Sequence, residues 1–61
     1  MKHLFRYLLV DINGFIEKYD PQELKLNQYI IHKGEYYQIR DFEGGTIIAF
    51  SMKFLKGEVT I

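Results

Sequence analysis

Short apolar segments along the chain are separated by four glycine-containing pairs. The pairs are Asn13-Gly14, Lys33-Gly34, Gly44-Gly45 and Lys56-Gly57. Asn-Gly favours the type I′ turn, because both central residues of that turn have positive φ, and such turns join neighbouring antiparallel strands. Short strands between regularly spaced turns indicate an all-β fold. We therefore predict a five- to six-stranded antiparallel meander.

The first pair predicts a hairpin that joins residues 4–12 to residues 15–19 and places Ile12 opposite Phe15. Its first strand has apolar side chains on both faces, which is typical of a strand that is central or covered twice. A helix over residues 2–10 is the alternative, because several of these side chains are also four residues apart. We favour the strand. Its apolar residues are Leu4, Leu8, Val10 and Ile12 on one face and Phe5, Tyr7 and Leu9 on the other.

The segment after this hairpin has the spacing of a helix start. Asp20 stands at the N-cap position, Pro21 follows it, and Glu23 comes three residues after the cap. An acidic cap followed by Pro and then by Glu is a capping-box pattern. We predict one short helical turn near Pro21–Leu24, which links the first hairpin to the remaining strands.

The faces of the later strands follow if the three remaining pairs are two-residue loops. One face then collects Ile30, Tyr37, Ile39, Ile48, Phe50, Met52, Phe54, Val59 and Ile61. The other face is mixed and holds Tyr29, Ile31, Tyr36, Gln38, Arg40, Phe42, Ile47, Ala49, Ser51 and Lys53. A wrong register would scramble the apolar set, so its agreement supports this alignment. A three-residue loop with a bulge at Lys-Gly would shift the pairing by one residue.

Five or six short strands resemble the small barrels of SH3-like domains. The segment 33–41 has the general look of a hairpin from such a domain. The resemblance lies in the fold and implies a small barrel or a half-open sheet. It carries no motif of a particular family.

Length and composition limit how such a fold is held together. The chain has 61 residues, 48% of them hydrophobic, and no cysteine. We predict a single domain over residues 1–61 with no disulfide or cysteine-bound metal to stabilise it. A domain of about 60 residues buries only about 60% of the surface that its unfolded chain exposes. A partner chain would therefore add stability.

Charge and residue usage bear on the setting of the protein. Eight basic and eight acidic residues give a net charge of zero, so no long-range field attracts nucleic acid or an anionic membrane. The apolar runs are too short to span a bilayer, and we expect a cytoplasmic protein. Many of its residue types have AT-rich codons, which suggests a low-GC bacterium or its phage.

Side chains for catalysis or metal binding are few. Ser51 is the only serine, and a catalytic triad would need it beside His32 and, for example, Asp41. A metal site needs three or four convergent ligands, whereas His3 and His32 are the only histidines and lie on separate elements. We expect no catalytic residue, no metal and no cofactor, and hence no enzyme.

The mixed face supplies the candidate binding residues. They are Tyr29, Ile31, Tyr36, Arg40, Phe42 and Lys53. An apolar second face on so small a domain indicates a protein partner or a second copy of the chain. The alternative is a small barrel that binds single-stranded nucleic acid, with bases stacked on aromatic side chains beside basic ones. We favour a regulator, adaptor or inhibitor that binds protein, because the chain has no excess of basic residues.

Overall fold

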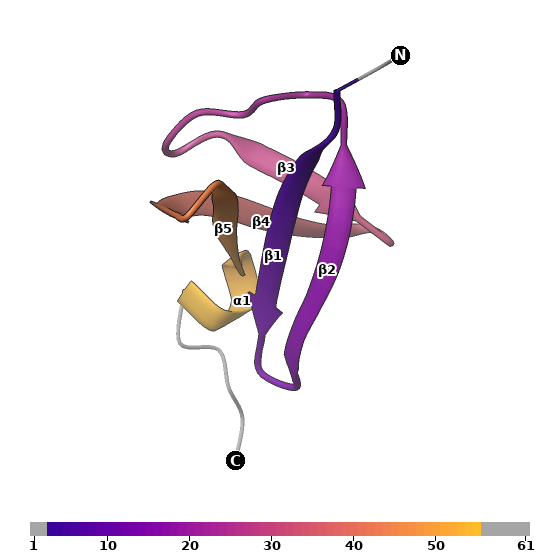
Figure 1. The fold of residues 1–61 in the computed structure, drawn as a ribbon. Coiled ribbons are helices and arrows are strands. Elements are labelled where there is room, and N and C mark those ends of the chain that lie inside the picture. Colours follow the sequence, from indigo (N-terminus) through magenta and orange to yellow (C-terminus); the bar gives the residue numbers. More distant parts are fainter. Residues whose placement is uncertain (1–2, 56–61) are drawn as a thin grey trace.

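The computed structural model describes residues 3–55. It contains five strands and one short helix, shown in Figure 1: β1 (Phe5–Asp11), β2 (Gly14–Asp20), β3 (Tyr29–His32), β4 (Glu35–Glu43), β5 (Thr46–Ser51) and α1 (Met52–Leu55). The strands form one curled sheet in the order β2-β1-β5-β4-β3. The predicted all-β, half-open fold is confirmed, and the N-terminal segment is a strand.

The sheet is mixed, which corrects the prediction of a purely antiparallel meander. β1 runs parallel to β5, with Tyr7 beside Ile47 and Leu9 beside Ala49. All other neighbours are antiparallel. The parallel contact makes β1 a central strand, as its two apolar faces indicate. Because the two strands are parallel, the carboxyl ends of β1 and β5 lie at the same end of the half-barrel (Figure 1).

Two of the four predicted turns are confirmed, and the predicted turn at Lys56-Gly57 lies outside the described residues. Lys33 and Gly34 connect β3 to β4 with φ values of 51° and 77°, and Gly44 and Gly45 connect β4 to β5 with φ values of 54° and 82°. Positive φ at both central residues is the type I′ geometry. These loops fix the registers next to them, with His32 opposite Glu35.

The first turn differs from the prediction. Asp11 pairs with Gly14, so the loop consists of residues 12–13, and Phe15 lies opposite Val10 rather than opposite Ile12. Only Gly14 has a positive φ here, at 124°, so the loop is not a type I′ turn. The Asp11 carboxylate accepts a hydrogen bond from the Asn13 backbone N–H at 2.7 Å. This local bond stabilises the turn one residue earlier in the chain.

The short helical turn is at residues 52–55 and not near Pro21–Leu24. The carboxylate of Asp20 accepts from Gln22 N–H at 2.9 Å, which is a bend rather than a helix start. Leu24 N–H donates to the Tyr7 hydroxyl at 3.1 Å, and this contact holds the segment across the half-barrel. At α1, Ser51 Oγ accepts from Phe54 N–H at 3.0 Å, as an N-cap serine does.

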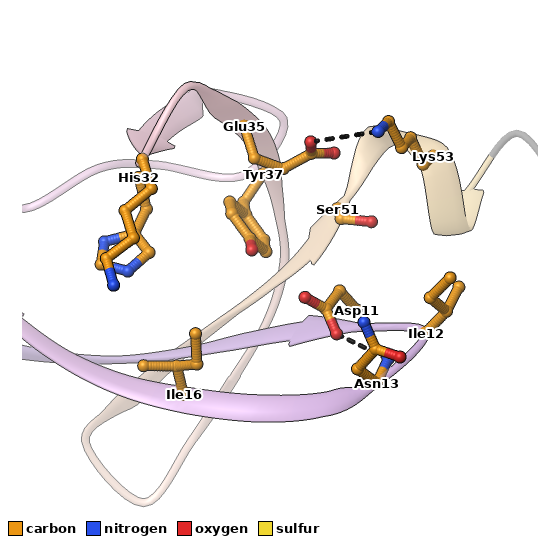
Figure 2. Close-up of a pocket in the computed structure, with 10 residues that line it drawn as sticks. Asp11, Ile12, Asn13, Ile16, His32, Glu35, Tyr37, Ser51 and Lys53 are labelled. Carbon is orange, nitrogen blue, oxygen red and sulfur yellow. Dashed lines mark hydrogen bonds and ion pairs between the residues drawn. The ribbon is translucent and has the colours of Figure 1, made fainter.

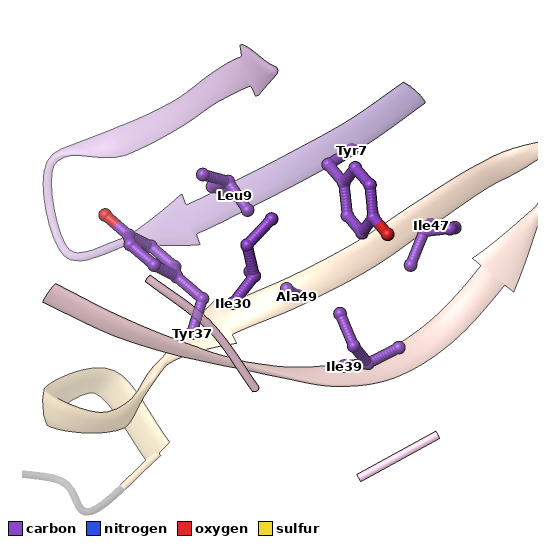
Figure 3. Packing of buried hydrophobic residues seen from close by; sticks show 7 residues of the cluster. All are labelled: Tyr7, Leu9, Ile30, Tyr37, Ile39, Ile47 and Ala49. Carbon is purple, nitrogen blue, oxygen red and sulfur yellow. The ribbon is translucent and has the colours of Figure 1, made fainter. Parts of the chain in front are cut away.

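The core lies on the inner, concave face of the sheet and is shown in Figure 3. It consists of Tyr7, Leu9, Ile30, Tyr37, Ile39, Ile47 and Ala49. Phe5 and Leu24 are partly buried against it. Leu24 comes from the segment between β2 and β3, so that segment covers one end of the half-barrel.

A β-bulge changes the face that β5 presents. The register of β4 with β5 shifts between Ile39 and Asp41, so Arg40 is an extra residue. The bulge places Ile47 and Ala49 in the core, together with Ser51 of the same strand. The sequence-based alignment, which assumed no bulge, is wrong in placing Ile48, Phe50 and Met52 there, since all three are only partly buried. The predicted positions Val59 and Ile61 lie outside the described residues.

Within residues 3–55, no helix is long and apolar enough to cross a membrane.

Candidate functional site

The outer, convex face of the sheet carries a row of side chains that crosses all five strands. Starting from β2, the cross-strand partners are Phe15, Val10, Phe50, Gln38 and Tyr29. Every strand except β4 contributes an apolar or aromatic residue to this row. Partners in a sheet point to the same face, so these side chains lie together on the side opposite the core. We call this face the outer face.

Further apolar side chains widen the row in both directions. Leu8 pairs with Ile48 on β1 and β5, and Ile31 pairs with Tyr36 on β3 and β4. The rings of Tyr29 and Tyr36 meet edge to face, with centroids 6.4 Å apart. This edge-to-face contact is a favourable geometry for an aromatic pair, so the two rings support each other at the surface.

The helix adds a shallow groove to the outer face. The Phe50 and Phe54 rings meet at 5.6 Å and an angle of 63°. Beside them is an open hollow of about 430 Å³ lined by Arg40, Asp41, Phe50, Phe54 and Leu55. Arg40 also donates to Gln38 Oε1 at 3.3 Å. The groove is thus lined by three apolar side chains and by one basic and one acidic residue.

The outer face of the strands carries slightly more acidic than basic side chains. Arg6 forms an ion pair and hydrogen bond with Glu17, its neighbour on β2. Arg40 is the other basic residue, whereas Asp41 and Glu43 are both acidic. The face therefore lacks the basic groove that tracks a nucleic-acid backbone.

The structure brings together four of the six predicted binding residues. Tyr29, Ile31, Tyr36 and Arg40 share the outer face of β3 and β4 and are all exposed. The other two lie elsewhere. Phe42 pairs with the buried Ile47 and so belongs to the inner face, because it follows the bulge. Together with Phe5 it lines a hollow of about 270 Å³ on that side. Lys53 belongs to α1, where its ammonium is 3.9 Å from a carboxylate oxygen of Glu35.

Sequence reasoning did not include the apolar outer side chains of β1, β2 and β5 in its binding set. Among them are Leu8, Val10, Phe15, Ile48 and Phe50. The signal for the first two was the apolar character of both faces of the first strand. Because only one of those faces can lie in the core of a single curled sheet, the other must be outside.

The open end of the half-barrel holds a third, more polar hollow of about 320 Å³, shown in Figure 2. Tyr37, which is only 3% exposed, lies between His32 and Ser51 in this view. Burial raises the pKa of Tyr37, and the carboxylates of Asp11 and Glu35 raise it further. A neutral phenol beside two carboxylates acts as a hydrogen-bond donor. The hollow is therefore polar at one wall, whereas Ile12 and Ile16 line another part of it.

The polar groups of this hollow have structural partners. Ser51 Oγ caps α1, and Asp11 holds the first turn. Asp41, the acid considered for a triad, is instead on the outer groove. Among the described residues, no group of three His, Cys, Asp or Glu side chains is arranged to hold a metal ion.

No known relative helps to assign a function. Comparisons with protein-family models, with curated proteins and with solved structures gave no match. The geometry of the outer face is therefore what supports a functional proposal.

Proposed function

We propose that this chain is a small non-catalytic protein-binding module that uses the outer face to bind another protein or a second copy of itself. It would act as a regulator, an adaptor or an inhibitor. The cytoplasmic location and the bacterial or phage source expected from the sequence belong to the same proposal.

The observation that carries the proposal is the apolar outer face itself. Both faces of the sheet are apolar, but only the inner face is covered within residues 3–55. Ile31, Tyr36 and Tyr29 are 53%, 53% and 47% exposed on neighbouring strands. Single exposed apolar side chains are normal, whereas contiguous ones mark interaction sites. A row to which four of the five strands contribute an apolar or aromatic side chain is of the second kind.

The residue types on this face also suit a protein partner. Tyrosine and arginine are enriched where proteins bind each other and dominate the binding energy there. Tyr29, Tyr36 and Arg40 stand together beside the groove of Phe50 and Phe54. An apolar side chain of a partner could fill this groove while Arg40 and Asp41 bond at its rim.

A capture experiment with two matched variants tests the proposal. Ile31 and Leu26 have nearly equal exposure, 53% and 52%, but Leu26 lies in the segment between β2 and β3 and not on the outer face. The tagged wild type, Ile31→Gln and Leu26→Gln are used as bait in lysate of the source cell, with and without nuclease. We expect a protein that the wild type and Leu26→Gln retain, that Ile31→Gln loses, and that nuclease does not release.

Two outcomes would contradict the proposal. Equal retention of all captured proteins by the two variants would show that the outer face is not the binding surface. Capture that nuclease abolishes, with affinity that falls steeply as salt rises, would favour the nucleic-acid alternative. In that case Tyr36→Ala and Arg40→Ala should weaken the binding of single-stranded oligonucleotides.

A further inference from the structure

The half-barrel ends in two edge strands, β2 and β3. Each has a single neighbouring strand within the described part of the chain. An edge strand leaves one row of backbone N–H and C=O groups without a strand partner, so it can pair with a strand of another chain. β2 has seven residues and β3 has four. β2 is thus the longer free edge.

Few of the features that protect an edge strand are present in β2. Its register with β1 is regular from Gly14 to Asp20, so no bulge turns it away from another chain. Two of its side chains on the inner side are charged, since Lys18 pairs with Tyr7 and Asp20 with Phe5. On the outer side Phe15 is 67% exposed, the highest value among the large hydrophobic residues described, and Tyr19 is 56% exposed. The edge therefore has no bulge and carries two exposed aromatic side chains on its outer side.

We infer that two copies of the chain pair through β2, antiparallel and with Glu17 on the twofold axis, to form one continuous ten-stranded sheet. The inference goes beyond the proposed function, because it names a second copy of the chain as a partner and the β2 edge, rather than the outer face, as the surface that binds it.

The register follows from symmetry. A twofold axis between antiparallel edge strands is perpendicular to the sheet, so each outer residue must oppose an outer residue. The axis must therefore pass midway between two copies of the same residue. An axis at Glu17 pairs all seven residues of β2, whereas an axis at Ile16 or at Lys18 pairs only five. With Glu17 on the axis, Phe15 opposes Tyr19 of the second copy, and this aromatic pair occurs twice.

Charge is compatible with this register. Glu17 would face Glu17 of the second copy, which is unfavourable for two bare carboxylates. Each of them is already paired with Arg6 of its own chain, so two guanidinium groups and two carboxylates share the axis with no net charge. An axis at Lys18 would bring two ammonium groups together, and at Ile16 it would place Phe15 opposite a carboxylate. The Glu17 register avoids both.

Pairing at β2 leaves the outer face open. In the strand order, β1 and β5 separate the β2 edge from β3 and β4, and Tyr29 and Tyr36 lie on the outer face rather than at an edge. The outer faces of the two copies would join at the axis into one surface of twice the width. A protein partner could then bind each half, as the proposed function requires.

Single cysteines test the register, because the chain has none of its own. Ile16→Cys, Glu17→Cys and Lys18→Cys are each incubated in glutathione redox buffer, where oxidised glutathione accepts the electrons of disulfide formation. Leu26→Cys, at an equally exposed residue outside the strands and off the outer face, reports random collisions. We expect Glu17→Cys to form the disulfide-linked dimer roughly tenfold faster or more than the other three, since pairing holds its two thiols together.

Sedimentation equilibrium supplies a second readout without cysteine. The wild type should change from monomer to dimer as its concentration rises. Phe15→Gln and Arg6→Gln should dimerise only at concentrations at least about tenfold higher, and Leu26→Gln should match the wild type. Equal crosslinking at all four positions, or association that Phe15→Gln leaves unchanged, would overturn the inference. A wild type that stays monomeric would also overturn it, while the capture experiment would still decide the proposed function.

Discussion

The two faces of the sheet are nearly equal in apolar content but differ in what covers them. On β1, Leu9 is fully buried on the inner face, and its neighbour Leu8 is only half-buried on the outer face. The same contrast holds on β5 between Ala49 and Ile48. Curvature makes the difference, because the concave face closes on itself and the convex face cannot. Hydrophobicity alone therefore does not show which face of a small sheet is the core.

The largest test of this comparison uses the two adjacent leucines of β1. Leu9→Ala should lower the free energy of unfolding by about 2–5 kcal/mol, because it leaves a cavity in the core. A domain of this size has on the order of 3–9 kcal/mol in total, so the variant should be partly unfolded at room temperature. Urea denaturation followed by far-UV circular dichroism measures the loss.

Leu8→Ala is the matched control, with the same chemical change one residue away. It should cost on the order of 1 kcal/mol or less, since a half-exposed side chain leaves no closed cavity. Equal losses for the two variants would mean that the outer face is covered as well as the inner one. A second copy could do this, and the loss at Leu8 would then grow with protein concentration.

The sequence was informative where local chemistry decides the structure. Lys33-Gly34 and Gly44-Gly45 identify their turns, because only a few residue types accept two successive positive φ values. The apolar residues on both faces of residues 4–12 predicted a central strand, which the structure confirms. Four members of the predicted binding set also lie together on the outer face, because alternation along β3 and the start of β4 was aligned correctly.

The errors arise where distant contacts decide. No local feature of Arg40 and Asp41 indicates a bulge, yet this one extra residue exchanges the two faces of β5 and moves Phe42 away from the other binding residues. The Asp20–Leu24 segment has the residues of a helix start, but Tyr7 binds it in another conformation from 17 residues away. The parallel contact of β1 with β5 is likewise non-local, so turn chemistry could not predict it.

The next prediction compares a tyrosine on each face. The Tyr7 hydroxyl donates to the Gln22 carbonyl and accepts from Leu24 N–H. Tyr7→Phe leaves both backbone groups without their partner and should cost about 1–3 kcal/mol. Tyr19→Phe removes an exposed hydroxyl and should change the free energy of unfolding by no more than about 0.5 kcal/mol. Thermal unfolding at neutral pH measures both, and a similar loss for each would show that Tyr7 does not anchor the segment.

The smallest predicted effect is a loss of stability at alkaline pH that comes from two tyrosines of the inner face. Burial raises the pKa of both Tyr7 and Tyr37 above the ordinary value of a tyrosine. Unfolded tyrosine loses its proton near about pH 10, so above this pH the unfolded chain binds fewer protons than the folded one. The free energy of unfolding must then fall as pH rises. The contribution of the buried phenols is complete below about pH 10 and is lost above it.

A comparison of slopes separates the contribution of Tyr37 from those of the other titratable groups. The free energy of unfolding, measured with urea between about pH 9 and pH 11, should fall less steeply with pH in Tyr37→Phe than in the wild type. The two slopes should differ by no more than about 1.4 kcal/mol per pH unit. Leu8→Ala, which changes no titratable group, should keep the wild-type slope. If Tyr37→Phe also kept the wild-type slope, then the Tyr37 phenol would reach solvent through the open end of the half-barrel. The inner face would then be less covered at this end than the 3% exposure of Tyr37 indicates.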